Sequence, residues 1–425
     1  MRGKLHFDAV VIGAGTAGLV AGARLAEGGA RVCVLAKGVG STHLAPGTID
    51  VLGYSPERVE RPGRAVTQLA ADDPEHPYAL LGTEVVEDAL HWFSARIAAG
   101  LLPGYRYVGD LERNHLLPTA VGVLRPSALV PETMAAGDGT SSEPLVVVGT
   151  SALRDFHASL CAANLGQIGL EARAVVLELT LDRADQNSLG LARRFDDPSW
   201  RGQFADQLAP LLGSDGRGRV GLPAVLGIAD PHTVWTELQD RLGRPVFEIP
   251  TLPPSVPGMR MFEILRATLR SARGRLVIGA EVVGSERQQA RVNAVISRAA
   301  GRDVVYSADW FVLAGGGFAS GAIELDSRWR TRERIFGLPL RGLPEPGQPR
   351  FVGEYFAEQP IARVGVAVDG ELRAEGLENV LVAGAALPGA IPWRELSGEG
   401  IALASGYRAA GAILAAAGVR ERITA

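Results

Sequence analysis

The chain has 425 residues, of which 47% are hydrophobic and 21% are charged, a balance typical of a globular protein rather than a disordered or fibrous one. Its length exceeds what one hydrophobic core usually supports and predicts two domains. The 43 basic residues are matched by 47 acidic ones without a polybasic run, so the formal net charge of −4 argues against a nucleic-acid partner.

The N-terminal region has the pattern of a Rossmann-like β-α-β unit. We expect a buried parallel strand, the glycine-rich turn G-A-G-T-A-G, a helix and a second strand, at residues 7–12, 13–18, 19–27 and 31–35. In this context Gly13 permits a tight turn, Gly15 lets the backbone approach a pyrophosphate, and Gly18 lets helix and strand pack closely. The unit predicts a dinucleotide-binding site at the helix N-terminus.

Cysteine usage and hydropathy limit the other chemistry that this chain can carry. Cys33 and Cys161 are the only cysteines, so the chain cannot supply four thiolates for an iron–sulfur cluster. We expect no metal site, and any cluster would belong to a partner. The apolar stretch 9–26 is interrupted by glycines and Arg24, which argues against a membrane span. Asp8 precedes a strand pattern and no small-residue cleavage site follows, which argues against a signal peptide. We therefore expect a cytoplasmic chain.

The rest of the sequence predicts a large insertion between two parts of the nucleotide-binding domain. Residues 54–143 are rich in prolines and loops. The three prolines of 251–258 indicate an ordered extended loop or a linker, and we favour the ordered loop. We expect a discontinuous flavin-binding domain (1–53 plus 274–425) and an inserted cap or interface domain (54–273). The remaining expected elements are strands at 145–148, 275–283, 290–298, 308–314 and 379–386, and helices at 152–164 (capped by Thr150 or Ser151), 259–272 and 399–416.

The end of the second predicted strand departs from the pattern of a nicotinamide site. Ala36 stands where an acidic residue would usually hold the ribose hydroxyls. The next segment, K-G-V-G-S-T-H-L-A-P-G (37–47), resembles the flavin-contact segment of the succinate dehydrogenase, fumarate reductase and L-aspartate oxidase families. This resemblance implies a flavin, with cofactor contacts from Lys37, Ser41, Thr42 and Gly47.

Several candidate residues have two interpretations each. Lys37, one of only two lysines, either places a point charge on a cofactor phosphate or ribose, or is a solvated lysine at a strand end. His43 either acts catalytically, by a hydrogen bond to the flavin ring or a proton relay, or is structural. Val282 is expected beside the adenine, and Gly384 and Gly398 beside the flavin, unless they serve ordinary packing.

Most of the chain also resembles one family, the B subunits of the anaerobic glycerol-3-phosphate dehydrogenases. The proline-rich tract T-L-P-P-S-V-P-G-M-R is the most specific match, because generic flavoproteins have no reason to share it. The other matching stretches are F-D-A-V-V-I-G-A-G-T-A-G-L, H-L-A-P-G-T-I-D-V-L, H-P-Y-A-L-L-G, V-V-G-T-S-A-L-R-D-F, V-L-A-G-G-G-F-A-S-G, Q-P-I-A-R-V-G-V and N-V-L-V-A-G.

This resemblance implies one component of a heterotrimer. An FAD-containing catalytic partner and an iron–sulfur partner would accompany this chain, and the iron–sulfur partner would attach the complex to the inner face of the cell membrane and pass electrons toward menaquinone. The implied reaction oxidises sn-glycerol 3-phosphate to dihydroxyacetone phosphate, on this chain or on the FAD-containing partner. The family implies FMN in this chain, whereas the dinucleotide motif favours FAD, so both remain open.

Arg260, directly after the proline-rich tract, is the second catalytic candidate. We expect the tract to line the site or the partner interface, with the guanidinium bound to a phosphate or carboxylate, unless Arg260 only begins a solvated helix. The sequence thus predicts an α/β flavoprotein of the two-dinucleotide-binding-domain type, with a Rossmann-like N-terminus and an inserted cap. A stand-alone flavin oxidoreductase and a flavin-free assembly component are the alternatives.

Overall fold

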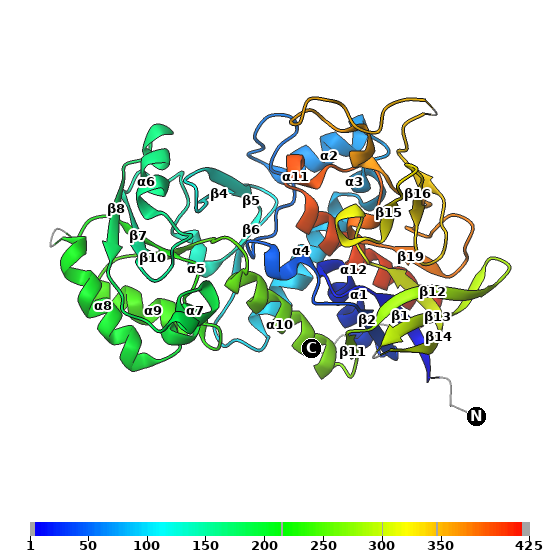
Figure 1. The fold of residues 1–425 in the computed structure, drawn as a ribbon, viewed down its shortest axis with the longest axis horizontal. Coiled ribbons are helices and arrows are strands. Elements are labelled where there is room, and N and C mark those ends of the chain that lie inside the picture. The colour runs from blue at the N-terminus through cyan, green and yellow to red at the C-terminus, as the bar shows by residue number, and fades with distance from the viewer. Residues whose placement is uncertain (1–4, 214–215, 300, 346, 419–425) are drawn as a thin grey trace.

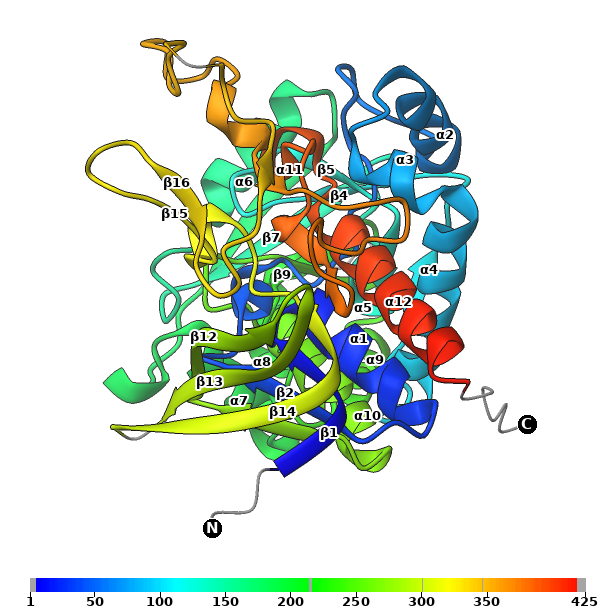
Figure 2. The same ribbon diagram turned by 90° about the vertical axis from the view of Figure 1, so that its right-hand side faces the viewer.

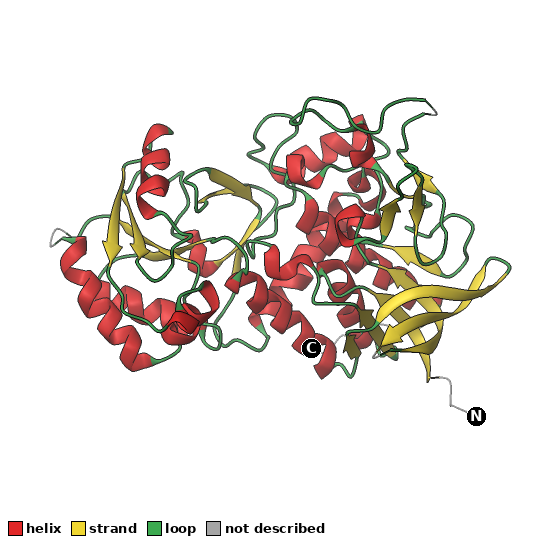
Figure 3. Ribbon diagram, in the orientation of Figure 1, coloured by secondary structure: helices red, strands yellow, loops and turns green. Residues whose placement is uncertain are grey.

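The structure is a computed structural model that describes residues 5–213, 216–299, 301–345 and 347–418. Two lobes lie side by side, each built on its own β-sheet (Figure 1). Helices pack against the sheet in both lobes (Figure 3). The predicted α/β architecture with a Rossmann-like N-terminus is confirmed.

The sheet of the first lobe joins segments from both ends of the chain. Its order is β11 (Arg275–Ile278), β2 (Val32–Ala36), β1 (Leu5–Ile12), β14 (Arg302–Leu313), β13 (Arg291–Ala299) and β12 (Glu281–Gln288), with β19 (Val380–Val382) beside the end of β14. β1, β2, β11, β14 and β19 are parallel, whereas β12 and β13 pair antiparallel. All five residues of β2 are buried, as expected of a parallel strand covered on both faces.

The helices of the first lobe come from distant parts of the chain. They are α1 (Thr16–Glu27), α2 (Pro62–Asp72), α3 (Pro77–Leu81), α4 (Thr83–Ala98), α10 (Val256–Ser271), α11 (Pro392–Glu395) and α12 (Gly398–Ala416). α1 packs against α10 and α12, and α12 packs against α4 (Figure 2). Short elements complete the lobe: η1 (Ser41–Leu44), η3 (Phe318–Ser320), β15 (Ile323–Leu325), β16 (Thr331–Glu333), β17 (Leu340–Arg341), η4 (Pro360–Arg363), β18 (Gly365–Val366) and η5 (Gly384–Ala386).

The second lobe has a fully parallel sheet and a separate hydrophobic core. Its strand order is β10 (Val246–Ile249), β9 (Arg219–Pro223), β7 (Leu145–Thr150) and β8 (Ala172–Leu177). The helices are α6 (Ala158–Gln167), α7 (Ser188–Phe195), α8 (Pro198–Leu212) and α9 (Pro231–Leu242). Short elements of this lobe and of its boundary with the first are β3 (Tyr107–Gly109), β4 (His115–Pro118), β5 (Leu124–Ser127), β6 (Leu129–Pro131), α5 (Glu132–Ala135) and η2 (Arg183–Asp185).

Three details differ from the expected elements. α6 begins at Ala158 rather than 152, because Thr150 extends β7 and the Ser151 hydroxyl accepts the backbone N–H of Leu179 at 2.9 Å, so neither residue caps the helix. The strand expected at 275–283 divides at Gly279, where φ is +82°, because β11 pairs with β2 and β12 pairs with β13. Helices α2 to α4 pack in the core of the first lobe, so the two cores do not divide at residue 54.

Helix α10 belongs to both lobes. Val256 in its first turn is buried in the second core, whereas Met261, Ile264 and Leu269 are buried in the first. A single helix of 16 residues therefore contributes side chains to two cores that are otherwise separate. Helix α10 is therefore one connection between the lobes, and the β-bridge between Ile49 and Leu129 is another.

Arg260 holds α10 in the second lobe and does not face a ligand. Its guanidinium donates to the two carboxylate oxygens of Glu248 at 2.7 and 2.9 Å and to the carbonyl of Gly227 at 2.9 and 2.7 Å. Both side chains of this ion pair are 0% exposed, and Thr133 donates a further hydrogen bond to Glu248. The expectation of a phosphate-binding Arg260 is therefore corrected, because protein groups already occupy its guanidinium.

We expect Arg260→Ala to lower the free energy of unfolding by about 3–5 kcal/mol, because it leaves the Glu248 carboxylate buried without its cation. Urea denaturation measures this loss. Arg266→Ala is the matched control on the same helix, since it removes a partly exposed ion pair with Glu263 and should cost less than about 1 kcal/mol. Equal losses in the two variants would contradict the structural role of Arg260.

Candidate functional site

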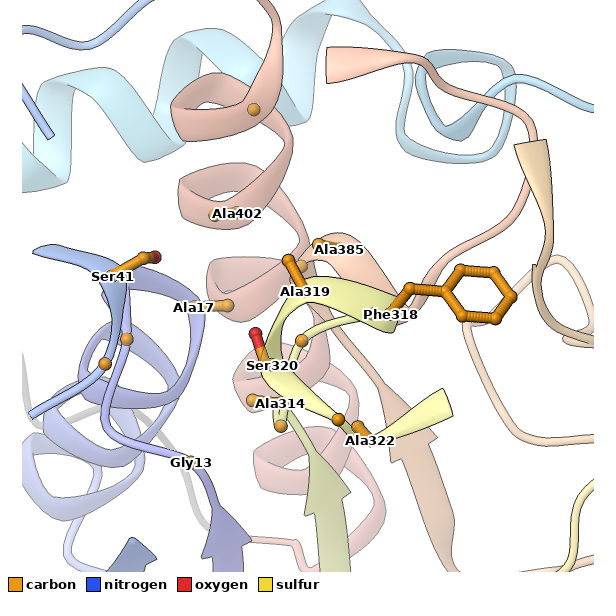
Figure 4. A pocket seen from close by; sticks show the side chains of 18 of the residues that line it. Gly13, Ala17, Ser41, Ala314, Phe318, Ala319, Ser320, Ala322, Ala385 and Ala402 are labelled. Carbon is orange, nitrogen blue, oxygen red and sulfur yellow. The ribbon is translucent and has the colours of Figure 1, made fainter. Parts of the chain in front are cut away.

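A cavity of about 930 Å³ lies at the carboxyl ends of the parallel strands in the first lobe. This volume lies within the range of small-molecule sites, which is roughly 300–1,000 Å³. Five parts of the chain supply most of the wall: residues 12–17, 35–44, 280–282, 314–322 and 384–402. Figure 4 shows the Gly13 turn and Ala17 on one side, with Ala314, Ser320 and Ala385 on the other.

The strand order indicates how far the cavity extends along the edge of the sheet. At their carboxyl ends the strands lie in the order β11, β2, β1, β14 and β19, and residues after each of these strands line the cavity. Neighbouring strands are roughly 4.8 Å apart, so the row of five ends extends over roughly 19 Å. An extended dinucleotide matches this length, whereas a mononucleotide would leave one end unfilled.

The three glycines of the turn have different surroundings. A Cβ at Gly13 would lie 2.2 Å from the carbonyl oxygen of Ala314, and a Cβ at Gly18 would lie 2.0 Å from the carbonyl oxygen of Gly13. A Cβ at Gly15 would meet no protein atom within 4 Å, and the backbone there has an ordinary φ of −75°. Gly13 and Gly18 are thus required by packing, whereas Gly15 leaves open space in the cavity.

The N-terminus of α1 faces the same space. No side chain caps this helix, and Gly15, Thr16 and Ala17 all line the cavity. Free backbone N–H groups and the positive end of the helix dipole suit a phosphate or pyrophosphate. These features fit the dinucleotide part of FAD.

Seven of the proposed site residues line the cavity: Gly13, Gly15, Lys37, Ser41, Val282, Gly384 and Gly398. The other five are absent from its wall as the structure describes it: Gly18, Thr42, His43, Gly47 and Arg260. Gly18 has the packing role expected of the third glycine in the turn. We propose the lining residues other than Lys37 as cofactor contacts, since the Lys37 side chain is paired with Glu281.

Thr42, His43 and Gly47 pack against the start of α10 instead. The backbone N–H of Ser255 donates to the His43 carbonyl at 2.8 Å, and a Cβ at Gly258 would lie 2.0 Å from the carbonyl oxygen of Thr42. A Cβ at Gly47 would lie 2.4 Å from Cβ of Pro257. The proline-rich tract therefore supports the 41–47 segment from behind, while Ser41 and Leu44 face the cavity.

The His43 side chain lies outside the cavity wall. Its ring packs edge-on against Phe262, with 4.9 Å between ring centroids. Burial lowers the pKa of His43, although the nearby Glu263 acts in the opposite direction. The expected contact between this histidine and a flavin ring is not what the structure shows, because its segment turns the ring toward α10.

Glu399 is a functional candidate that sequence reasoning missed. It lies in the first turn of α12, lines the cavity, and accepts a hydrogen bond from the Thr16 hydroxyl at 2.8 Å. Burial raises the pKa of Glu399 to about 6, opposed by the Thr16 hydrogen bond. An acidic residue in a first helical turn is common for dipole reasons alone, so its position along the chain carries no distinct signal.

We expect Gly15→Val to fold normally and to lose flavin binding, because the protein has room for the side chain but the ligand does not. Thermal unfolding of the cofactor-free protein should change little, while flavin content after purification should fall at least about tenfold, equivalent to 1.4 kcal/mol. Gly166→Val is the control, since Gly166 also has no atom within 4 Å of an added Cβ and lies in α6. A yellow Gly15→Val protein would contradict the assignment.

Comparison with known proteins places this geometry in a family. A model of the FAD binding domain matches residues 8–401. The anaerobic glycerol-3-phosphate dehydrogenase B subunit of Pectobacterium atrosepticum is 31% identical over 425 residues, which cover 96% of this chain and 99% of that protein. The B subunit of Yersinia enterocolitica is 32% identical, and the alignment covers 97% of this chain and 99% of that protein. A probable B subunit of Halobacterium salinarum is 32% identical, and the alignment covers 95% of this chain and 97% of that protein.

Two solved structures have weaker overall similarity. The 3-ketosteroid delta1-dehydrogenase from Sterolibacterium denitrificans has a TM-score of 0.45 at 13% identity, over 97% of this chain and 100% of that chain. The E. coli quinol fumarate reductase has a TM-score of 0.45 at 9% identity, over 97% of this chain and 71% of that chain.

The family match makes the cofactor a flavin and favours FAD over FMN. The chain belongs to the FAD-binding flavoproteins, and among them to the family of anaerobic glycerol-3-phosphate dehydrogenase B subunits.

Proposed function

We propose that this chain is the flavin-bearing B subunit of a dehydrogenase that oxidises sn-glycerol 3-phosphate to dihydroxyacetone phosphate. The single observation that carries the proposal is the cavity at the glycine turn, in a chain that aligns over nearly its whole length with proteins named as that component. Electrons would pass from this complex toward a quinone. Oxidation removes a hydride from carbon 2 and a proton from its hydroxyl group, which leaves a ketone.

A flavin bound in the cavity supplies the acceptor for two electrons. The chain contributes the surroundings: the N–H groups at the start of α1 would bind the pyrophosphate, and small side chains such as Ala14, Ala314 and Ala402 would form an apolar wall beside the cofactor. Glu399 holds or releases a proton near neutral pH within this wall. These roles do not require His43 or Arg260.

Partner chains form the second part of the proposal. The relatives' names describe one component of a larger complex, and we propose an FAD-containing catalytic partner and an iron–sulfur partner beside it. Among the described residues, no helix has the length and apolar character to cross a bilayer, and no group of His, Cys, Asp and Glu could hold a metal. Attachment to the inner face of the membrane and the cluster itself would come from the iron–sulfur partner.

The experiment that tests the proposal separates it from both alternatives. Mass spectrometry of the released cofactor is expected to identify FAD; a purified chain without any flavin would support an assembly role instead. Glycerol 3-phosphate is expected to bleach the flavin absorbance in the reconstituted complex, with a quinone analogue restoring it. Full bleaching by the isolated chain would favour a stand-alone enzyme, and no bleaching in the complex would overturn the proposed substrate.

We expect Glu399→Gln to remove a pH-dependent loss of stability in the cofactor-free protein. Because burial raises the pKa of Glu399 from 4.5 to about 6, the folded chain binds this proton more tightly than the unfolded chain. Its contribution is full below about pH 4.5 and is lost as the pH rises through about 6, which amounts to at most about 2 kcal/mol. Urea denaturation at several pH values measures the difference between variant and wild type.

The control for this measurement is Glu57→Gln, because Glu57 is exposed and does not line the cavity. A Glu399→Gln protein with the wild-type profile between about pH 4 and 7 would show that this carboxyl group titrates normally.

A further inference from the structure

The cavity lacks an acidic residue at the position where dinucleotide sites usually have one. β2 ends at Ala36, whose side chain cannot accept a hydrogen bond from a ribose. Ala36 nevertheless lines the cavity together with Lys37. A bound adenosine at this end would need an acceptor from another element.

Glu281 reaches this position from a neighbouring strand. β11 runs parallel to β2 with Ile278 opposite Ala36, and the backbone N–H of Ala280 then donates to the Ala36 carbonyl at 2.9 Å. Glu281 is the next residue and begins β12. It lines the cavity, and its side chain is 32% exposed.

Two cations lie near one oxygen of this carboxylate, and one of them, Arg334, is shared with Glu324, whose Oε2 lies 3.2 Å from Nε of Arg334. Nζ of Lys37 lies 3.3 Å from Oε1, and Nη2 of Arg334 lies 3.7 Å from the same oxygen. Within the part of the chain that the structure describes, no hydrogen bond or ion pair involves Oε2 of Glu281. An isolated surface ion pair would explain the contact between Glu281 and Lys37. The nearby Arg334 and the position of Glu281 in the cavity wall instead indicate a carboxylate that is oriented to accept a hydrogen bond from a ligand.

We propose that Glu281 replaces the missing acidic residue of the second strand and accepts a hydrogen bond from a hydroxyl of the adenosine ribose, with Lys37 and Arg334 as positioning residues. This inference rests on the proposed function, since it requires a dinucleotide in the cavity. FMN has no adenosine ribose, so Glu281 makes the site selective for FAD.

The test compares three ligands with the cofactor-free protein. FAD and FMN are titrated by flavin fluorescence, and ADP, which has the same ribose without the flavin ring, by calorimetry. Glu281→Gln is expected to weaken FAD and ADP about tenfold, as for the loss of one charge-assisted hydrogen bond, and to leave FMN unchanged. Glu286→Gln is the matched control, because Glu286 is exposed further along the same strand and does not line the cavity.

Several results would overturn the inference. Unchanged affinities for FAD and ADP in Glu281→Gln would show that Glu281 only forms a surface ion pair. An equal loss of affinity for FMN would show that Glu281 does not act on the adenosine half of the cofactor. A wild-type protein that binds no flavin would refute the proposed function, while the ADP titration would still decide the role of Glu281.

A double-mutant comparison tests the role of Lys37. If Lys37 acts only by positioning Glu281, Lys37→Ala should weaken FAD binding in the wild type but cause no further loss in the Glu281→Gln background. Equal losses in both backgrounds would instead place Lys37 in direct contact with the ligand.

Discussion

The close approach of backbone segments at the end of β1 is the constraint on which the site depends. The carbonyl of Ala314 lies where a side chain on Gly13 would be, and the carbonyl of Gly13 lies where a side chain on Gly18 would be. Gly406 in α12 extends the same principle, since a Cβ there would lie 2.4 Å from the carbonyl oxygen of Ala17. α1 is thereby fixed between the sheet and α12, with its uncapped N-terminus at the cavity wall.

The second support of the site lies at the boundary between the lobes. The Arg260–Glu248 ion pair holds α10 in the second lobe, and the residues that precede Arg260 support the back of the 41–47 segment. Ser41 and Leu44 of that segment form part of the cavity wall. The proline-rich tract thus affects the cofactor site indirectly, by supporting the 41–47 segment, although the tract itself lies outside the cavity wall.

The sequence was informative where the signals were local. The turn from Gly13 to Gly18 is recognisable because strand, turn and helix follow one another within 30 residues, and the architecture built on it is confirmed. The actual surroundings of His43 and Arg260 could not be predicted, because Phe262 and Glu248 become their neighbours only through tertiary packing. Glu281 was missed for the same reason: it is far from Ala36 along the chain and adjacent to it across the sheet.

The unequal surroundings of the three turn glycines have a consequence for comparing relatives of this chain. Positions 13 and 18 should remain glycine in any relative that keeps the fold, whether or not it still binds a cofactor, because protein atoms fill the space beside them. Position 15 is under no such requirement, since only a ligand uses its space. A relative with a bulky residue at that one position would be a folded protein that has given up the flavin, so a single alignment column could separate electron carriers from scaffolds within the family.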